Sequence, residues 1–315
     1  MLNILAITSP IFALMGVGYA STRWGVFAKA DMRVLGKFVL NLALPALIFK
    51  AMASRPVAEV FNATYLVAYA LGSLGAMAVV YAVCRRGLGL APIKATFCAM
   101  GCSCSNSGFV GYPIVLLSLA SVAGVSLALN MVVENLLVIP LLLFMAERAR
   151  GSDLGAGRAV VQALQRLAVN PLVLGLVGGL LVSASGVTLP APVARTVDML
   201  AMASGAVSLL VIGGTLVGLP LRGLSLRVLP LALGKLVLHP FLVWLALAVL
   251  PWLGFEPLEP ALHTAAVLCA AMPMMGIYPT LAQPHGQEEW TAVALLVTTV
   301  VSFLTLSAWL WGLLG

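Results

Sequence analysis

The sequence predicts an all-α membrane protein of ten transmembrane helices, built as two five-helix halves of opposite orientation. Three observations predict this class: an apolar composition, regularly spaced apolar runs, and a motif that recurs at one offset. Of the 315 residues, 62% are hydrophobic and 9% are charged, whereas soluble domains carry about 25% charged residues. A surface this apolar does not stay in water, which excludes an ordinary soluble domain.

The apolar runs are long enough to cross a bilayer, since a transmembrane helix needs about 20 residues. Breaks between the runs divide the chain into ten candidate spans. In order, spans 1 to 10 cover residues 2–24, 34–53, 60–84, 93–119, 122–146, 169–187, 196–219, 228–252, 260–284 and 289–314. No Lys or Arg precedes span 1, so we interpret it as a retained helix rather than a signal peptide.

The positions of lysine and arginine test this division and set the orientation. Fourteen of the 17 lie at the connections that follow spans 1, 3, 5 and 7, and only Lys50, Arg55 and Arg195 lie on the other side. Because cytoplasmic loops collect Lys and Arg, we predict a multi-pass protein of the inner (plasma) membrane with both termini on the outer side. The basic residues do not cluster with aromatic residues, which argues against a nucleic-acid partner.

Motifs of other protein classes are missing from the sequence. The five cysteines lack the spacing of a zinc site and are expected to be small packed thiols. Neither a Walker motif nor a serine- or zinc-protease motif occurs. We therefore expect no cofactor and no metal, no ATP hydrolysis by this chain and no enzymatic activity.

A short motif recurs in spans 4 and 9, where a glycine lies shortly before a Tyr-Pro pair. The two prolines, Pro113 and Pro279, are 166 positions apart. The same offset carries span 3 onto span 8 and span 2 into span 7, which chance matches seldom do. Each half then holds five spans, and this odd number inverts the second half. The predicted halves are residues 1–150 and 169–315, joined by a cytoplasmic linker at 151–168.

The recurring motif also predicts that spans 4 and 9 are broken. Proline removes a backbone donor, and glycine weakens a helix further. In lipid, such irregular backbone survives only where protein or a water-filled cavity shelters it. Two matching breaks predict a crossing near the midplane, where the electropositive ends of half-helices favour an anion. The alternative is that Pro and Gly are simply commoner in membrane helices.

Residues Asn106 to Pro113 resemble a motif of the auxin efflux carrier family, which includes bacterial malonate-type carriers and plant auxin exporters. Asn41 to Phe49 resembles the second-span motif of that family, and Ala271 to Gly276 resembles its second crossover. The resemblance extends over nearly the whole chain. It implies a scaffold of spans 1, 2, 6 and 7, a transport domain of spans 3–5 and 8–10, and a possible homodimer.

The candidate substrate-binding residues lie on these three segments. They are Asn41, Pro45, Asn106, Ser107, Gly108, Gly111, Tyr112, Pro113, Pro273, Gly276, Tyr278 and Pro279. The side chains of Asn106 and Ser107 either bind a carboxylate, close the gap left by Pro113, or join helices by hydrogen bonds. The two tyrosines either donate hydroxyls to a ligand or pack. Asn41 and Pro45 face the substrate path by resemblance, or form a kink with its local polar partner.

The candidates for ion or proton coupling are Glu134, Asn135 and His239. Ionisable residues inside a membrane are functional by default, so Glu134 in span 5 is a candidate proton carrier, with a structural hydrogen bond as the alternative. His239 is either a proton site or a packing residue. Lys235, four residues before it, is expected to extend to the cytoplasmic surface. Asp198 is expected to be solvated near the outer end of span 7.

Together these features predict a secondary active transporter, for efflux or uptake, of a small organic anion such as a dicarboxylate or an auxin-like carboxylate. It would work by alternating access, in a lipid bilayer, with possible proton or sodium coupling. The alternatives are a sodium-coupled symporter of the bile-acid type, a channel and an intramembrane enzyme.

Overall fold

The computed structural model describes residues 2–54, 62–150, 168–218 and 228–314, which contain helices and turns but no β-strand. The chain forms two compact units, each assembled from three stretches of sequence. The first unit comprises Met1–Asn62, Gly108–Leu129 and Ala168–Leu221, and the second comprises Ala63–Ser107, Asn130–Leu167 and Arg222–Gly315. The all-helical class is therefore confirmed. The predicted linker at 151–168 lies, apart from its last residue, outside the described residues.

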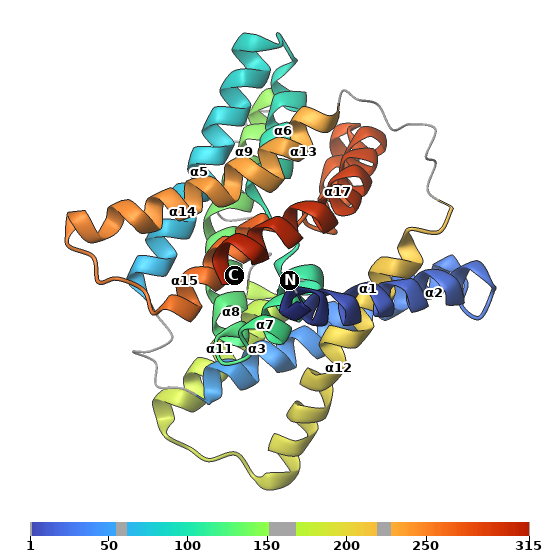
Figure 1. The fold of residues 1–315 in the computed structure, drawn as a ribbon, viewed down its shortest axis with the longest axis vertical. Coiled ribbons are helices and arrows are strands. Elements are labelled where there is room, and N and C mark those ends of the chain that lie inside the picture. Colours follow the sequence, from blue (N-terminus) through green and yellow to red (C-terminus); the bar gives the residue numbers. More distant parts are fainter. Residues whose placement is uncertain (1, 55–61, 151–167, 219–227, 315) are drawn as a thin grey trace. The chain divides into compact units, whose positions relative to one another are not determined.

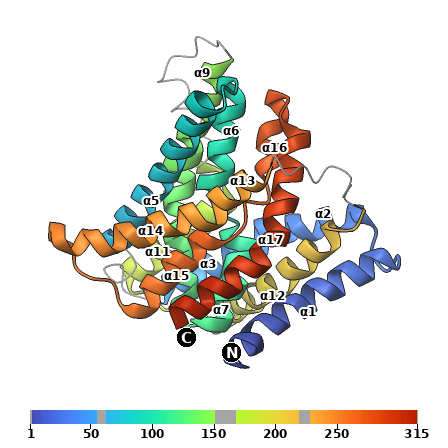
Figure 2. The same cartoon turned by 45° about the horizontal axis from the view of Figure 1, so that its top comes forward.

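The first unit consists of helices of seven to 25 residues. They are α1 (Leu2–Arg23), α2 (Lys29–Phe38), α3 (Leu44–Ala53), α7 (Tyr112–Ser118), the first part of α8 (Ala123–Val133), α11 (Pro171–Ser185) and α12 (Ala191–Thr215). Helix α1 packs along α12, and α3 packs along α11 (Figures 1 and 2). A side chain at Gly213 would overlap the carbonyl of Met15, and one at Gly175 would overlap that of Pro45. Glycine lets these backbones approach, as is common between membrane helices.

The second unit contains the remaining helices. They are α5 (Ala63–Ala82), α6 (Pro92–Ser103), α9 (Ile139–Ala149), α13 (Leu229–Leu233), α14 (His239–Val249), α15 (Pro260–Ala271), α16 (Tyr278–Ala282) and α17 (Glu288–Leu314). Helices α5 and α14 cross closely (Figure 1), because Gly72 leaves room for the backbone of Val243. The resemblance placed all of spans 4 and 5 in one domain. Instead, Gly108–Leu129 belongs to the first unit, so both spans are divided between the two units.

Six helical stretches of the described residues are long and apolar enough to cross a membrane. They are Lys29–Ala53, Ala63–Gly87, Ala123–Ala149, Ala191–Thr215, Leu229–Leu253 and Glu288–Leu314. They correspond to the predicted spans 2, 3, 5, 7, 8 and 10. Spans 4, 6 and 9 contain shorter apolar helices, and α1 covers span 1. The protein is thus a helical membrane protein of several spans, and the number of ten crossings stays a prediction.

Of the five π-helical turns among the described residues, four end two residues before a proline, and Val83–Gly87 does not. The four are Val39–Ala43, Ser107–Gly111, Glu134–Val138 and Gly234–Leu238. A proline has no N–H and its ring collides with the preceding turn, so an extra residue fits into the helix ahead of it. Leu44, for example, donates its N–H to the carbonyl of Val39, five residues back. Such turns often mark functional sites, and Asn41, Ser107, Glu134 and Lys235 each lie in one.

Candidate functional site

Two interrupted helices pair with each other in the second unit. Helices α6 and α15 both end there and continue as extended backbone. Ser105 and Met274, one from each stretch, form an antiparallel β-bridge, and the N–H of Asn106 donates to the carbonyl of Pro273 at 2.8 Å. An unpaired backbone group in lipid costs several kcal/mol. The two breaks therefore satisfy each other, although they come from opposite halves of the chain.

The breaks do not lie where the Tyr-Pro pairs are. Pro279 is the second residue of α16, which begins after the second break, and at the start of a helix a missing N–H leaves no hydrogen bond unmade. Pro113 instead lies inside the continuous helical stretch Ser107–Ser118, where the π-helical turn Ser107–Gly111 precedes it. The closing of a gap at Pro113 by the side chain of Asn106 or Ser107 stays a prediction. Only Pro273, of the three candidate prolines near the motifs, belongs to an extended stretch.

Asn106 and Ser107 lie at the paired stretch, as predicted from the motif. Asn106 is 9% exposed, and its side-chain nitrogen lies beside Gly276 of the second break. The buried hydroxyl of Ser107 makes no close hydrogen bond among the described residues, but it interacts with the carboxylate of Glu134. A buried polar atom needs a partner, and Glu134 is the one that the structure offers. Binding of a substrate by these residues stays a prediction.

A fully buried lysine joins the broken segments. The ammonium nitrogen of Lys235 lies 2.7 Å from Ser105 Oγ, 2.7 Å from the carbonyl oxygen of Ala270 and 2.8 Å from His239 Nδ1. These three acceptors match the three hydrogens of an ammonium group. The Ala270 carbonyl is available because it lies in the last turn of α15, where carbonyls lack a partner within the helix. The expectation that Lys235 extends to the surface is therefore wrong.

His239 continues this network toward α5. Its Nε2 lies 3.0 Å from Ser73 Oγ, and the edge of its ring meets the ring of Tyr69 at 5.7 Å between centroids. Because Nδ1 accepts from the lysine, the hydrogen-bond network assigns the ring proton to Nε2, which donates to Ser73. His239 is thus a neutral, fully bonded imidazole here. A role in proton transfer remains a prediction.

Glu134 supplies the opposite charge to the same break. It is 2% exposed, and its Oε1 accepts from the N–H of Ser105 at 2.9 Å and from the hydroxyl of Tyr69 at 3.1 Å. Ser105 therefore contacts Glu134 through its backbone and Lys235 through its hydroxyl. Ser105 thus links a buried acid to a buried base. A change in the charge of Glu134 or Lys235 therefore alters the hydrogen bonds of Ser105 at the crossing. We call Ser73, Ser105, Glu134, Tyr69, Lys235 and His239 the crossing network.

Two of the candidate asparagines bind their own helices. The side-chain nitrogen of Asn41 donates to the carbonyl of Lys37 at 2.7 Å, and that of Asn135 donates to the carbonyl of Met131 at 2.9 Å. Both carbonyls lie four residues back, next to a π-helical turn. Asn41 thus makes the local hydrogen bond of one interpretation, and its place on a substrate path stays a prediction. The side-chain nitrogen of Asn135 also lies near the sulfur of Met131, so these contacts stay within its own helix. Coupling through Asn135 stays a prediction.

The two candidate tyrosines differ in their surroundings. Tyr278 is fully buried and donates its hydroxyl to the carbonyl of Phe97 at 2.6 Å. Tyr112 lines a cavity of about 520 Å³ in the first unit, between α3, α7, α8 and α12. A cavity of this size is typical of small-molecule sites. Of these two tyrosines, Tyr112 is therefore the better placed to meet a ligand.

The candidate residues are divided between the units. The second unit holds Asn106, Ser107, Glu134, Asn135, His239, Pro273, Gly276, Tyr278 and Pro279, and the first holds Asn41, Pro45, Gly108, Gly111, Tyr112 and Pro113. Gly108 lies against the Leu44 side chain. Sequence reasoning missed Tyr69, Ser73 and Ser105. A signal for two of them existed, because Tyr69 and Ser73 precede Lys235 and His239 by 166 residues, the offset of the repeated motif.

A side chain brings positive charge to the crossing in addition to the helix ends. After the first break the helical stretch Ser107–Ser118 begins with a π-helical turn, and after the second break α16 has five residues, so few peptide dipoles add up in α16. Lys235 brings a whole ammonium group into the crossing network. Anion binding by the half-helix ends stays a prediction.

The fold and this network agree with comparisons with known proteins. A family described as "Membrane transport protein" matches residues 6–310 of this chain. The chain belongs to this membrane transport protein family. The match confirms the resemblance to auxin efflux carriers, and it makes the protein a transporter and not an enzyme.

Relatives with assigned names cover nearly the whole length of this family member. A protein of Rhizobium meliloti (strain 1021) named "Putative malonate transporter" is 30% identical over 99% of this chain and 96% of its own length. A protein of Escherichia coli (strain K12) named "Uncharacterized transporter YfdV" is 26% identical over 96% and 94%. Both names are those of transporters, in agreement with the family.

Proposed function

We propose that this transporter is a secondary carrier of a small organic anion that works by alternating access. The observation that supports this most is the pairing of two interrupted helices from opposite halves of the chain, at Ser105 and Met274. Broken helices that meet in the membrane are the usual substrate and ion sites of secondary transporters. The name of the Rhizobium meliloti relative favours a dicarboxylate such as malonate, and an auxin-like monocarboxylate is the second substrate that we propose.

The proposed carrier has ten spans in two inverted halves, residues 1–150 and 169–315. One contact supports a two-fold relation between them. Ser73 and His239, which are 166 residues apart and hence equivalent in the two halves, bind each other. Equivalent residues of two repeats meet where a symmetry axis passes between them, as residues do across a two-fold interface. The distribution of Lys and Arg supports termini on the outer side of the plasma membrane.

Coupling to protons rather than sodium is part of this proposal. A sodium site needs several converging oxygens, and two that converge at the crossing, Ser105 Oγ and the Ala270 carbonyl, accept from the ammonium of Lys235. Glu134, in contrast, is a buried carboxylate in the same network and can take up a proton. Replacing sodium by choline should therefore leave transport unchanged, and a sodium-dependent rate would contradict this part.

Counterflow tests the proposed function directly. Purified protein in phosphatidylcholine vesicles is preloaded with unlabelled malonate, or with indole-3-acetate, and the labelled compound is added outside. A carrier accumulates label transiently above its equilibrium level, because outward movement of one molecule returns the site for another. A channel gives no such overshoot. Absence of counterflow with both carboxylates would overturn the proposal.

A further inference from the structure

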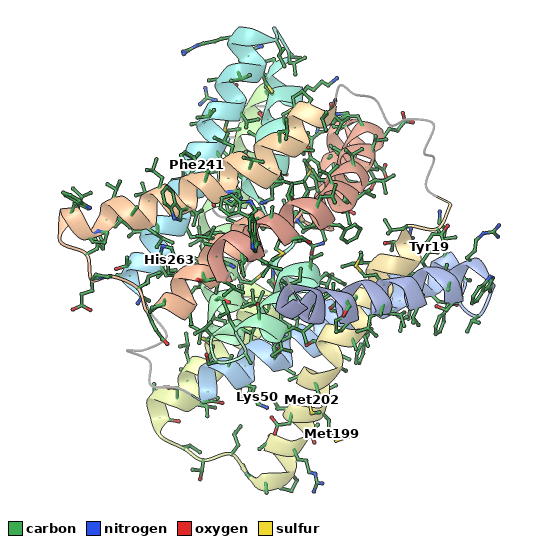
Figure 3. The ribbon with its side chains drawn as sticks, in the orientation of Figure 1. Tyr19, Lys50, Met199, Met202, Phe241 and His263 are labelled. Carbon is green, nitrogen blue, oxygen red and sulfur yellow. The ribbon has the colours of Figure 1, made fainter. Side chains whose placement is uncertain are left out.

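A half-exposed lysine lies between two cavities of the first unit. Lys50, in the last turn of α3, lines both the cavity of about 520 Å³ and a second one of about 650 Å³. Figure 3 labels Lys50 together with Met202 of α12, another residue that lines the smaller cavity. The ammonium nitrogen of Lys50 lies 2.8 Å from Oδ1 of Asp198, and both side chains are 46% exposed. An ion pair so open to its surroundings contributes little to stability.

The two cavities differ in charge. Asp198 lines only the larger one, so its negative charge is balanced there by Lys50. Among the described residues that line the smaller cavity, Lys50 is the only charged one. A cavity with one basic residue and mostly apolar walls suits a ligand that has a carboxylate and a small non-polar body.

Two of the serine hydroxyls around the smaller cavity do not replace Lys50 as donors. Ser54 donates to the carbonyl of Lys50 at 2.6 Å, and Ser204 donates to the carbonyl of Ala201 at 2.6 Å. A hydroxyl has one hydrogen to give, so these two present only acceptor oxygens to a ligand. Among the described residues that line this cavity, only Lys50 carries a positive charge. Tyr112 lines the same cavity.

We propose that Lys50 is an anion-binding residue of the smaller cavity, and that Asp198 is its internal competitor. In the empty site Asp198 binds the ammonium group of Lys50. A carboxylate that enters the cavity replaces Asp198 as the partner of Lys50. The arrangement assigns the substrate class, a carboxylate whose remainder contacts the apolar walls near Tyr112. This inference rests on the proposed function and adds to it a residue that neither the sequence motifs nor the crossing network contains.

Transport kinetics test the exchange. Initial rates of malonate and of indole-3-acetate entry are measured against concentration, in vesicles of phosphatidylcholine alone, which offer no anionic lipid headgroup as a competitor. Lys50→Met keeps the length of the side chain and should raise KM about tenfold, the effect of one hydrogen bond to a charged group. Asp198→Asn frees the lysine and should lower KM by about two- to fivefold. Lys50→Arg should keep KM close to that of the native protein.

Arg195→Gln is the matched control, because it removes an exposed positive charge one turn from Asp198 that lines neither cavity. It should change KM by less than about twofold, through screened long-range attraction. An unchanged KM in Lys50→Met would overturn the inference. An unchanged or raised KM in Asp198→Asn would also overturn it. If Lys50→Met does not fold, the Asp198→Asn measurement tests the inference by itself. Native protein that carries neither carboxylate would instead overturn the proposed function.

Discussion

The two units use lysine in opposite ways. Lys235 in the second unit is completely buried, and three uncharged acceptors bind its ammonium group. Lys50 in the first unit is about half exposed and binds a single acid, Asp198. Burying a charge is expensive, and removing one partner of a buried network leaves the others unsatisfied, whereas an exposed pair separates at little cost. The difference suggests a fixed charge in the second unit and an exchangeable one in the first.

The largest expected effect comes from Lys235→Met. It leaves Glu134 as a buried acid without its positive counterpart and deprives Ser105 of a donor, so we expect a loss of about 3–5 kcal/mol of stability and no transport. Thermal unfolding of the purified protein in detergent measures the first, and vesicle uptake the second. Lys94→Met, which removes an exposed lysine above the ring of Trp290, should change neither. A native-like melting temperature in Lys235→Met would show that the buried ammonium group and its three acceptors do not stabilise the fold.

Asn106→Ala is expected to abolish carboxylate uptake while the protein stays folded. The backbone pair between Asn106 and Pro273 survives the change, so only the side-chain amide at the crossing is lost. Uptake into vesicles and elution as a single peak from a sizing column measure the two properties. Normal uptake by this variant would remove the span-4 site from the proposal.

Glu134→Gln should have a smaller effect on the rate and a specific effect on its pH dependence. The amide oxygen can still accept from Ser105 and Tyr69, but the side chain can no longer release or take up a proton. A proton-coupled carrier should therefore show a flattened pH profile in this variant. Glu289→Gln, at an exposed helix start, should keep the native profile. An unchanged profile in Glu134→Gln would rule out the proton role.

Ser54→Ala should have the smallest effect of this series. The Ser54 hydroxyl donates to the backbone of Lys50 and leaves the ammonium group untouched. We expect KM for malonate to stay within about twofold of the native value, since a neutral hydrogen bond contributes little at an exposed position. A shift as large as that of Lys50→Met would mean that the position of the helix end, rather than the lysine charge, determines binding.

Much of the fold could be predicted because the bilayer limits the possibilities. Apolar length alone identified the six long helices, and the paired Gly and Tyr-Pro motifs identified both segments that are broken. The position of each break was less predictable. Proline is harmless at the second residue of a helix, so Pro279 marks where α16 begins. Pro113 is the seventh residue of the helical stretch Ser107–Ser118 and follows its π-helical turn.

The crossing network could be predicted only in part. Glu134 and His239 were identified because an ionisable residue in an apolar run needs an explanation. Lys235 lies near one end of its run, where a long side chain usually extends to the surface. Its burial depends on Ser105, 130 residues away in the sequence, and on a carbonyl of a helix that ends early. Contacts of this kind come from tertiary structure and leave no local pattern.

The π-helical turns ahead of the prolines have a mechanical consequence. A surplus residue in a helix can be passed along the backbone, one peptide at a time, while each N–H exchanges one carbonyl for its neighbour. With 3.6 residues per turn, each such step turns the side chain of the residue that the surplus passes by about 100° around the helix axis. Glu134 and Lys235 both lie in turns of this type. Their side chains can therefore change orientation without leaving a peptide group unpaired in the hydrocarbon interior.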